Sequence, residues 1–215
     1  MVFDVGANLG NRIDAFLSCG ASVICLEPQP ECVKHLASVY GSDKRVTILQ
    51  CAAGETECDM PIRRVKPSDT MATMSEEFIL RTDRTGRFGN RPYTESLTVK
   101  VIKVESLIEK FGRPSFIKID VEGFEERVLA GISTHLSALS FEWTPEMFDH
   151  ADRCMQICET LGLKYFHISF GESMKFCHPR TISRPEMEGL LISLATDVAL
   201  FGDIYAFNSP LERVR

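Results

Sequence analysis

The sequence lacks a continuous apolar stretch of the about 18 residues that a membrane-spanning helix needs. It also lacks the basic and then apolar segment of a signal peptide ahead of the first expected strand. None of the eight cysteines forms a CxxC pair, and Cys154 and Cys158, which lie four residues apart, are not expected to hold a metal. These absences disfavour a membrane protein, a disulfide scaffold and a zinc site. They predict reduced cysteines in a cytoplasmic protein.

Positive charge is also scarce. Lys and Arg together number 24 against 30 Asp and Glu, which gives a formal net charge of -6. Proteins that bind a nucleic-acid backbone usually present a basic face, so nucleic acid is not expected as a partner. Arg81, Arg84, Arg87 and Arg91 nevertheless form a local cluster of positive charge.

Apolar residues recur along most of the chain as short continuous runs that alternate with stretches at helical spacing. This order predicts an α/β fold of the Rossmann-like, doubly wound type, with about seven strands, mostly parallel, joined by right-handed crossovers. No repeat, low-complexity tract or linker interrupts it, so residues 1–215 are expected to form a single domain. The expected core strands are 2–5, 22–26, 46–51, 116–120, 138–142, 165–169 and 204–207, and the expected helices are 12–19, 30–40, 104–111, 125–130, 147–161 and 185–195.

Residues 55–96 interrupt this alternation of expected strands and helices. Ile62–Val65 and Leu97–Val101 are expected to pair as a hairpin or sheet edge. The segment between them, Lys66–Glu95, is polar and poor in candidate core residues, so it is expected to be an irregular insertion. Long insertions of this kind are usually functional or mobile.

A glycine-bearing loop, Asp4-Val5-Gly6-Ala7-Asn8-Leu9-Gly10-Asn11, follows the first expected strand and leads into a helix. Glycine lets a backbone turn tightly and approach a ligand, and a helix N-terminus offers unpaired amides. Ligands of parallel sheets bind beyond the carboxyl ends of the strands. Other strand ends carry further candidate contacts, which are Glu27-Pro28 after the second strand and Ala52-Ala53 after the third.

Charge distinguishes between the adenosine cofactors that such a loop could hold. Glu27 lies 21 residues beyond Gly6, where a carboxylate can accept both ribose hydroxyls. The dinucleotide fingerprint has a middle glycine, but Asn8 stands there, and Asp4 would repel a pyrophosphate. The Asp4 carboxylate suits the ammonium group of S-adenosylmethionine (SAM), directly or through water. The loop therefore favours SAM over a nicotinamide dinucleotide.

Carboxylates also follow two later strands. Asp120 and Glu122 come after the strand that begins near Phe116, and Glu142 ends the next one. One such acid could orient the sulfonium end of SAM while another accepts a proton. A structural alternative exists for Glu125 and for Glu122, because acids at the start of a helix favour its dipole. Lys118 is expected on the same strand face as Asp120.

These segments resemble the FkbM-type SAM-dependent methyltransferases. The matching pieces are Val2–Gly10, Leu26-Glu27-Pro28 and Ile117–Gly123, with a weaker echo in Met71–Ser75. The resemblance spans about residues 2 to 143 and implies a class I methyltransferase fold that methylates a hydroxyl on a sugar or natural product. It also implies cofactor contacts at Gly6, Asn8, Gly10 and Glu27, and places Asp120, Glu122 and Glu142 beside the methyl group.

The expected chemistry is transfer of the SAM methyl group to an acceptor oxygen, with Glu122 or Glu142 as the base and Asp120 orienting the cofactor. A variant with Mg²⁺ on Asp120 and Glu142 is possible but not favoured. A non-catalytic SAM-binding module and an NAD-dependent oxidoreductase remain as alternatives. Residues 73–93 are expected to recognise the acceptor, a small molecule or glycan, or else to form a solvated loop. In the first case the four clustered arginines would grip a phosphate or carboxylate.

Overall fold

The computed structural model describes residues 1–65, 71–89 and 91–211. Its main sheet has seven strands in the order β10-β11-β9-β8-β1-β2-β3. β11 is antiparallel to both of its neighbours, and the remaining pairs are parallel. The expected mostly parallel, seven-stranded sheet is confirmed. Its strands are β1 (Val2–Val5), β2 (Val23–Leu26), β3 (Val46–Leu49), β8 (Phe116–Ile119), β9 (Ala138–Trp143), β10 (Tyr165–Phe170) and β11 (Gly202–Phe207).

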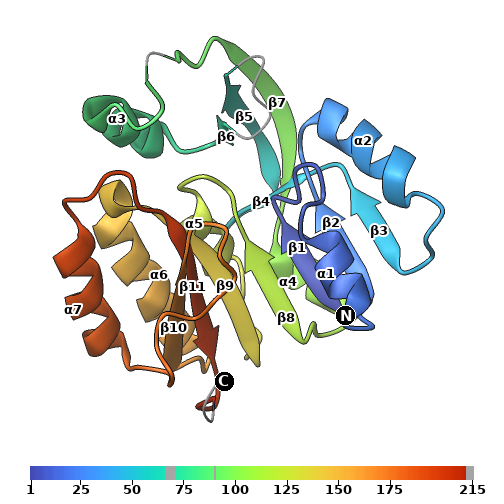
Figure 1. Ribbon diagram of the computed structural model, residues 1–215. Helices are drawn as coiled ribbons and strands as arrows, with labels where there is room; N and C mark the ends of the chain where they lie inside the picture. The colour runs from blue at the N-terminus through green and yellow to red at the C-terminus, as the bar shows by residue number, and fades with distance from the viewer. Residues whose placement is uncertain (66–70, 90, 212–215) are drawn as a thin grey trace.

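Helices pack against both faces of this sheet (Figure 1). In β2, Ile24 and Leu26 belong to the main core, which helices α4 to α7 complete, whereas Val23 and Cys25 belong to a second cluster with α1 and α2. The six expected helices are present. No helix among the described residues has both the length and the apolar character needed to cross a membrane. The helices of the two layers are α1 (Ile13–Ser18), α2 (Pro30–Tyr40), α4 (Val104–Phe111), α5 (Glu125–Ala130), α6 (Phe148–Thr160), which a 3-10 turn (Pro145–Met147) precedes, and α7 (Arg184–Leu194).

Strand order reverses between β1 and β8. The chain proceeds from β1 to β2 and β3 and then returns to pair β8 with the free edge of β1. The loops that follow β1 and β8 therefore leave the sheet side by side and run in opposite directions. In open α/β sheets this is the place where a ligand-binding crevice forms.

The insertion forms a second, four-stranded sheet in the order β4-β7-β5-β6. Its expected hairpin is confirmed, because β5 and β7 pair antiparallel with Ile62 opposite Leu97. The second sheet and helix α3 lie beyond the carboxyl ends of the main strands (Figure 1). They therefore cover the end of the sheet at which the crevice opens. The elements are β4 (Ala52–Ala53), β5 (Cys58–Arg64), β6 (Ala72–Thr73), α3 (Glu76–Thr85) and β7 (Glu95–Ile102).

Helix α3 corrects the expectation of an irregular insertion, although residues 66–70 and 90 lie outside the described part. The Ser75 side chain accepts a hydrogen bond from the Phe78 amide at 3.1 Å, and Gly86 ends the helix with φ +70°. Only Phe78 and Thr82 are buried along α3. Arg81 anchors it to Asp149 of α6. A helix held by ion pairs and one aromatic side chain has no broad apolar face, so hydrophobic periodicity did not indicate it.

Candidate active site

The loop after β1 contacts the loop after β8 backbone to backbone. Gly6 has φ +84°, and a Cβ atom built there would lie 1.8 Å from the carbonyl oxygen of Asp120. Asn8 also has a positive φ, 48°, which asparagine adopts more readily than most residues. Its side-chain oxygen accepts a hydrogen bond from the Leu9 amide at 2.8 Å. Glycine is therefore required at position 6 for the close approach of the two loops. Asn8 adopts the positive φ that a glycine would otherwise provide at the middle position of the motif.

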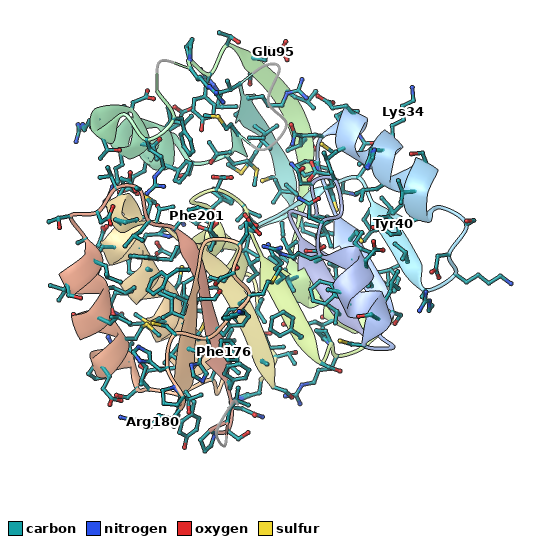
Figure 2. The ribbon with its side chains drawn as sticks, viewed as in Figure 1. Lys34, Tyr40, Glu95, Phe176, Arg180 and Phe201 are labelled. Atoms are coloured by element: carbon teal, nitrogen blue, oxygen red, sulfur yellow. The ribbon has the colours of Figure 1, made fainter. Side chains whose placement is uncertain are left out.

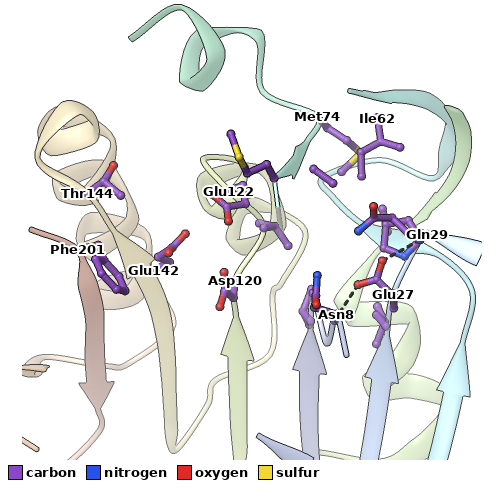
Figure 3. Close-up of a pocket in the computed structure, with 18 of the residues that line it drawn as sticks. Asn8, Glu27, Gln29, Ile62, Met74, Asp120, Glu122, Glu142, Thr144 and Phe201 are labelled. Carbon is purple, nitrogen blue, oxygen red and sulfur yellow. Dashed lines mark hydrogen bonds between the residues drawn. The ribbon is translucent and has the colours of Figure 1, made fainter. Parts of the chain in front are cut away.

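Glu27 joins this loop to the end of β2. Its two carboxylate oxygens accept hydrogen bonds from the backbone amides of Asn8 and Gln29, each at 2.8 Å (Figure 3). Burial raises the pKa of Glu27 to about 7, and the two amides oppose that rise. The carboxylate is thus fixed in orientation at the position expected for a ribose contact.

Three further carboxylates converge where β8 and β9 end. Asp120, Glu122 and Glu142 each present an oxygen, and these three oxygens lie within 4.8 Å of one another. Figure 3 shows the three side chains directed toward one space. The Lys118 ammonium lies 2.5 Å from a carboxylate oxygen of Asp120, as expected for two residues on one strand face. We refer to Asp120, Glu122 and Glu142 as the acid cluster.

The surroundings of the two glutamates of the acid cluster raise the pKa of each. Burial raises the pKa of Glu122 well above its ordinary range, and the nearby Asp120 carboxylate adds to the rise. Burial likewise raises the pKa of Glu142, and Glu122 adds to that rise. Carboxyl groups with raised pKa values are suited to exchange a proton near neutral pH.

The acid cluster and Glu27 line one cavity of about 570 Å³ between the main sheet and the insertion. This volume falls in the usual range for small-molecule sites. Most of the residues expected at the site contribute to its wall. They are Gly6, Asn8, Asn11, Glu27, Pro28, Ala52, Ala53, Asp120, Glu122 and Glu142.

Comparison with known proteins agrees with this geometry. Residues 4–165 match the family described as the methyltransferase FkbM domain. The chain belongs to the FkbM methyltransferase family. Over 143 residues it is 27% identical to the hexuronic acid methyltransferase AglP of Haloferax volcanii, which covers 66% of this chain and 53% of AglP. The crystal structure of the methyltransferase FkbM from Methylobacillus flagellatus KT superposes with a TM-score of 0.52 and 18% identity, over 96% of this chain and 43% of that one.

The chain therefore spans about half the length of these two relatives. At 18% identity, the likeness to the crystal structure concerns the fold. Together with the strand order, it shows the class I methyltransferase fold that the resemblance to the FkbM family implied.

The wall residues of this FkbM family member fit SAM better than a dinucleotide. The bare backbone at Gly6 leaves room beside Asp120, and Glu27 stands at the end of β2 for a ribose. Five acidic side chains line the cavity and would repel a pyrophosphate but favour the positive sulfonium and ammonium groups of SAM. They are Glu27, Asp120, Glu122, Glu142 and Glu172.

The acid cluster also has a spacing at which oxygen ligands could hold a divalent cation. The sequence suggested only Asp120 and Glu142 for this role, and the structure adds Glu122. Lys118 already places a positive charge 2.5 Å from Asp120, which disfavours a second cation at that carboxylate. A site without metal stays a prediction.

Three residues expected to contact the cofactor do not belong to the cavity wall. Ala7 packs in the second hydrophobic cluster with α1 and α2. A Cβ atom at Gly10 would lie 2.8 Å from a Leu36 side-chain atom, so Gly10 serves the contact between its loop and α2. Asp4 is 1% exposed within β1, and neither carboxylate oxygen has a hydrogen-bond partner among the described residues. A direct contact between Asp4 and SAM is therefore not supported, and one through water stays a prediction.

The insertion and the C-terminal strands supply wall residues that the sequence did not indicate. Met71, Ala72 and Met74 line the cavity, although Met71–Ser75 was recognised only as a family echo. Phe201 lies just before β11, at the end of the main sheet that faces the insertion (Figure 2). No local pattern distinguishes it, because only the fold brings β11 beside β9. The other unexpected wall residues include Gln29, Cys51, Ile62, Phe88, Thr144 and Glu172.

The four clustered arginines divide into two pairs. Arg81 and Arg84 are not among the residues that line the cavity, whereas Arg87 and Arg91 are.

Glu125 is not part of the acid cluster. Its carboxylate accepts hydrogen bonds from the amides of Val121 and Gly123 at 3.1 Å each. The structural role considered for Glu125 is thus confirmed.

The histidines and paired cysteines serve the core rather than the site. His150 and His167 are buried, and His167 stacks on Phe176 with 4.2 Å between ring centroids. Cys154 and Cys158 are fully buried on one face of α6. No disulfide joins any of the eight cysteines, all of which lie in the described part of the chain.

Proposed function

We propose that this chain is a SAM-dependent O-methyltransferase that acts on a hydroxyl of a sugar or natural-product-like acceptor. The observation that carries the proposal is the convergence of Asp120, Glu122 and Glu142 in the cavity that Gly6 and Glu27 also line. The acceptor class is supported by the 27% identical relative, which is named as a hexuronic acid methyltransferase. A sugar of that kind presents several hydroxyl groups.

SAM, when bound, supplies a methyl group activated by a sulfonium. The residues of the chain then have two tasks, which are to hold the reactants in line and to receive a proton. Glu27 holds the ribose, and the backbone around Gly6 lets the cofactor approach the sheet edge. Asp120, already paired with Lys118, orients the positive end of the cofactor.

Proton balance assigns a role to the two glutamates. As the acceptor oxygen bonds to the methyl carbon, the carbon–sulfur bond breaks and the hydroxyl proton must leave. Glu122 or Glu142 receives it, because burial and mutual repulsion make these carboxylates stronger bases than ordinary glutamates.

The test compares Glu122→Gln and Glu142→Gln with Glu109→Gln. Glu109 is exposed on α4 and does not line the cavity. The base variant should lose about 10²- to 10⁴-fold in kcat, with little change in SAM affinity measured by calorimetry. The Glu109→Gln control should stay near the activity of the unmodified protein. Full turnover in both cluster variants would contradict the assignment.

Three rival functions have separate readouts. A non-catalytic SAM-binding module would bind SAM without forming S-adenosylhomocysteine over a panel of hydroxylated acceptors. An NAD-dependent oxidoreductase would bind NADH in a fluorescence titration. A metal-assisted methyltransferase would lose turnover in EDTA and recover it with Mg²⁺, whereas the proposed base mechanism expects turnover to continue in EDTA.

A further inference from the structure

The cavity wall is strongly acidic and contains two cationic side chains among its described residues, Arg87 and Arg91. Both belong to the segment after α3, on the insertion side. In an acidic cavity, a cation that is not neutralised by the protein is available to a ligand. The contacts of the two arginines therefore decide which of them can serve an acceptor.

Arg87 is already engaged by the protein. Its guanidinium donates to both carboxylate oxygens of Glu146, at 2.9 and 2.7 Å, and to the carbonyl oxygen of Leu200 at 2.8 Å. The side chains of Arg87 and Glu146 are only 9% and 2% exposed. This bidentate, buried pair ties the insertion to the 3-10 turn and to the segment before β11. Arg87 is thus a structural cation.

Arg91 lines the same cavity as Arg87 but differs from it in burial and in contacts. It is exposed, and its side chain has no hydrogen-bond or ion-pair partner in the part of the chain that the structure describes. Arg81, by contrast, pairs with Glu77 and Asp149. Arg84 is exposed on α3 but does not line the cavity. Arg91 therefore combines an unneutralised guanidinium with a place on the wall.

We infer that Arg91 binds an anionic oxygen group of the acceptor, a carboxylate, and so selects acidic sugars over neutral ones. The inference rests on the proposed methyltransferase function and names the substrate class. A guanidinium presents paired N–H donors that match the two oxygens of a carboxylate. The acceptor hydroxyl would face Glu122 and Glu142 while the carboxylate faces the insertion.

The acid cluster does not prevent an anionic acceptor from entering. The Lys118 ammonium lies 2.5 Å from a carboxylate oxygen of Asp120 and offsets its charge. Bound SAM would add further positive charge. The net repulsion on an acceptor carboxylate is therefore smaller than the count of acidic side chains implies.

The experiment uses matched acceptors and matched variants. Methyl glycosides of hexuronic acids, of the corresponding neutral hexoses and of hexose phosphates are compared with the unmodified protein, Arg91→Ala, Arg91→Lys and Arg84→Ala. Arg84→Ala removes an exposed cation of the same segment that does not line the cavity. The readouts are KM and kcat from S-adenosylhomocysteine formation, and the affinity for SAM.

The expected result is a KM for the hexuronoside that rises about tenfold in Arg91→Ala, less in Arg91→Lys, and not at all in Arg84→Ala. The KM for the neutral hexoside and the SAM affinity should stay constant. A phosphate acceptor favoured over the hexuronoside would overturn the carboxylate assignment. Equal loss for acidic and neutral acceptors, or no loss, would overturn the inference. Absence of turnover with every acceptor, with SAM bound, would instead contradict the proposed function.

Discussion

Asp4 offers a prediction whose size follows from its surroundings. Its carboxylate is 1% exposed, opposite Lys118 in the β1–β8 register, and neither oxygen has a hydrogen-bond partner among the described residues. Burial raises its pKa from 3.8 to about 6, although Lys118 opposes the rise. Ionised Asp4 therefore destabilises the folded state, and Asp4→Asn should remove that cost while keeping the shape of the side chain.

The sign and magnitude of the effect follow from linkage. Between the unfolded pKa of 3.8 and the folded value of about 6, the folded state holds more protons, so the free energy of unfolding falls as pH rises. The full difference is about 3 kcal/mol, reached above the folded pKa. Glu27 and Glu125, whose pKa values burial raises to about 7, contribute with the same sign in protein and variant. Their contribution cancels in the comparison.

The assay is urea denaturation of the protein and of Asp4→Asn at several pH values from about 4 to 8. The stability of the variant relative to the unmodified protein should increase by about 2 to 3 kcal/mol across this range, with most of the change below about pH 7. Asp59→Asn, an exposed change on β5, is the control and should show no such trend. Parallel curves for the protein and for Asp4→Asn would refute the reasoning.

The affinity of Asp4→Asn for SAM tests whether Asp4 also contributes to cofactor binding. If Asp4 acts on the ammonium group of SAM through water, Asp4→Asn should weaken SAM binding by about tenfold at pH 8 while it stabilises the free protein. Unchanged affinity in the more stable variant would assign Asp4 to the fold alone.

Two other changes test the surroundings of the cofactor loop. Gly6→Ala should abolish measurable SAM binding and lower stability by about 1 to 3 kcal/mol, because its methyl group would meet the Asp120 carbonyl at 1.8 Å. Gly112→Ala shares the positive φ but has no atom within 4 Å of the added Cβ, so calorimetry should show normal SAM binding. Lys118→Met should cost at least about 2 kcal/mol in urea denaturation at pH 8 and less at pH 5, where Asp4 is largely protonated. An equal cost at both pH values would contradict the charge argument.

Many of the cavity residues at the edge of the main sheet could be predicted from the sequence alone. Gly6, Glu27, Asp120 and Glu142 all line the cavity, because the first three directly follow a buried strand and Glu142 lies near the end of one. Parallel strands end at one edge of their sheet, so residues after them share that edge. The FkbM likeness strengthened the same assignment but did not change the positions.

Helix α3 and the two arginine pairs could not be predicted in this way. The helix depends on Phe78 packing over Gly123, whose added Cβ would lie 2.6 Å from the Phe78 side chain. Arg87 and Arg91 look alike in the sequence, yet a buried carboxylate neutralises the first and leaves the second exposed. Contacts between residues far apart in the chain made that difference.

The order of strands and helices and the residues at the strand ends can be predicted from the sequence, because apolar periodicity and the turns that glycine permits are local properties. The tertiary structure decided which charges meet, which stay unpaired and which side chains form a cavity wall. It gathered three carboxylates within 4.8 Å of one another from two strand ends, buried Asp4 and left the Arg91 side chain without a partner among the described residues. Charge acts through distance and burial, and both are set only when the chain has folded.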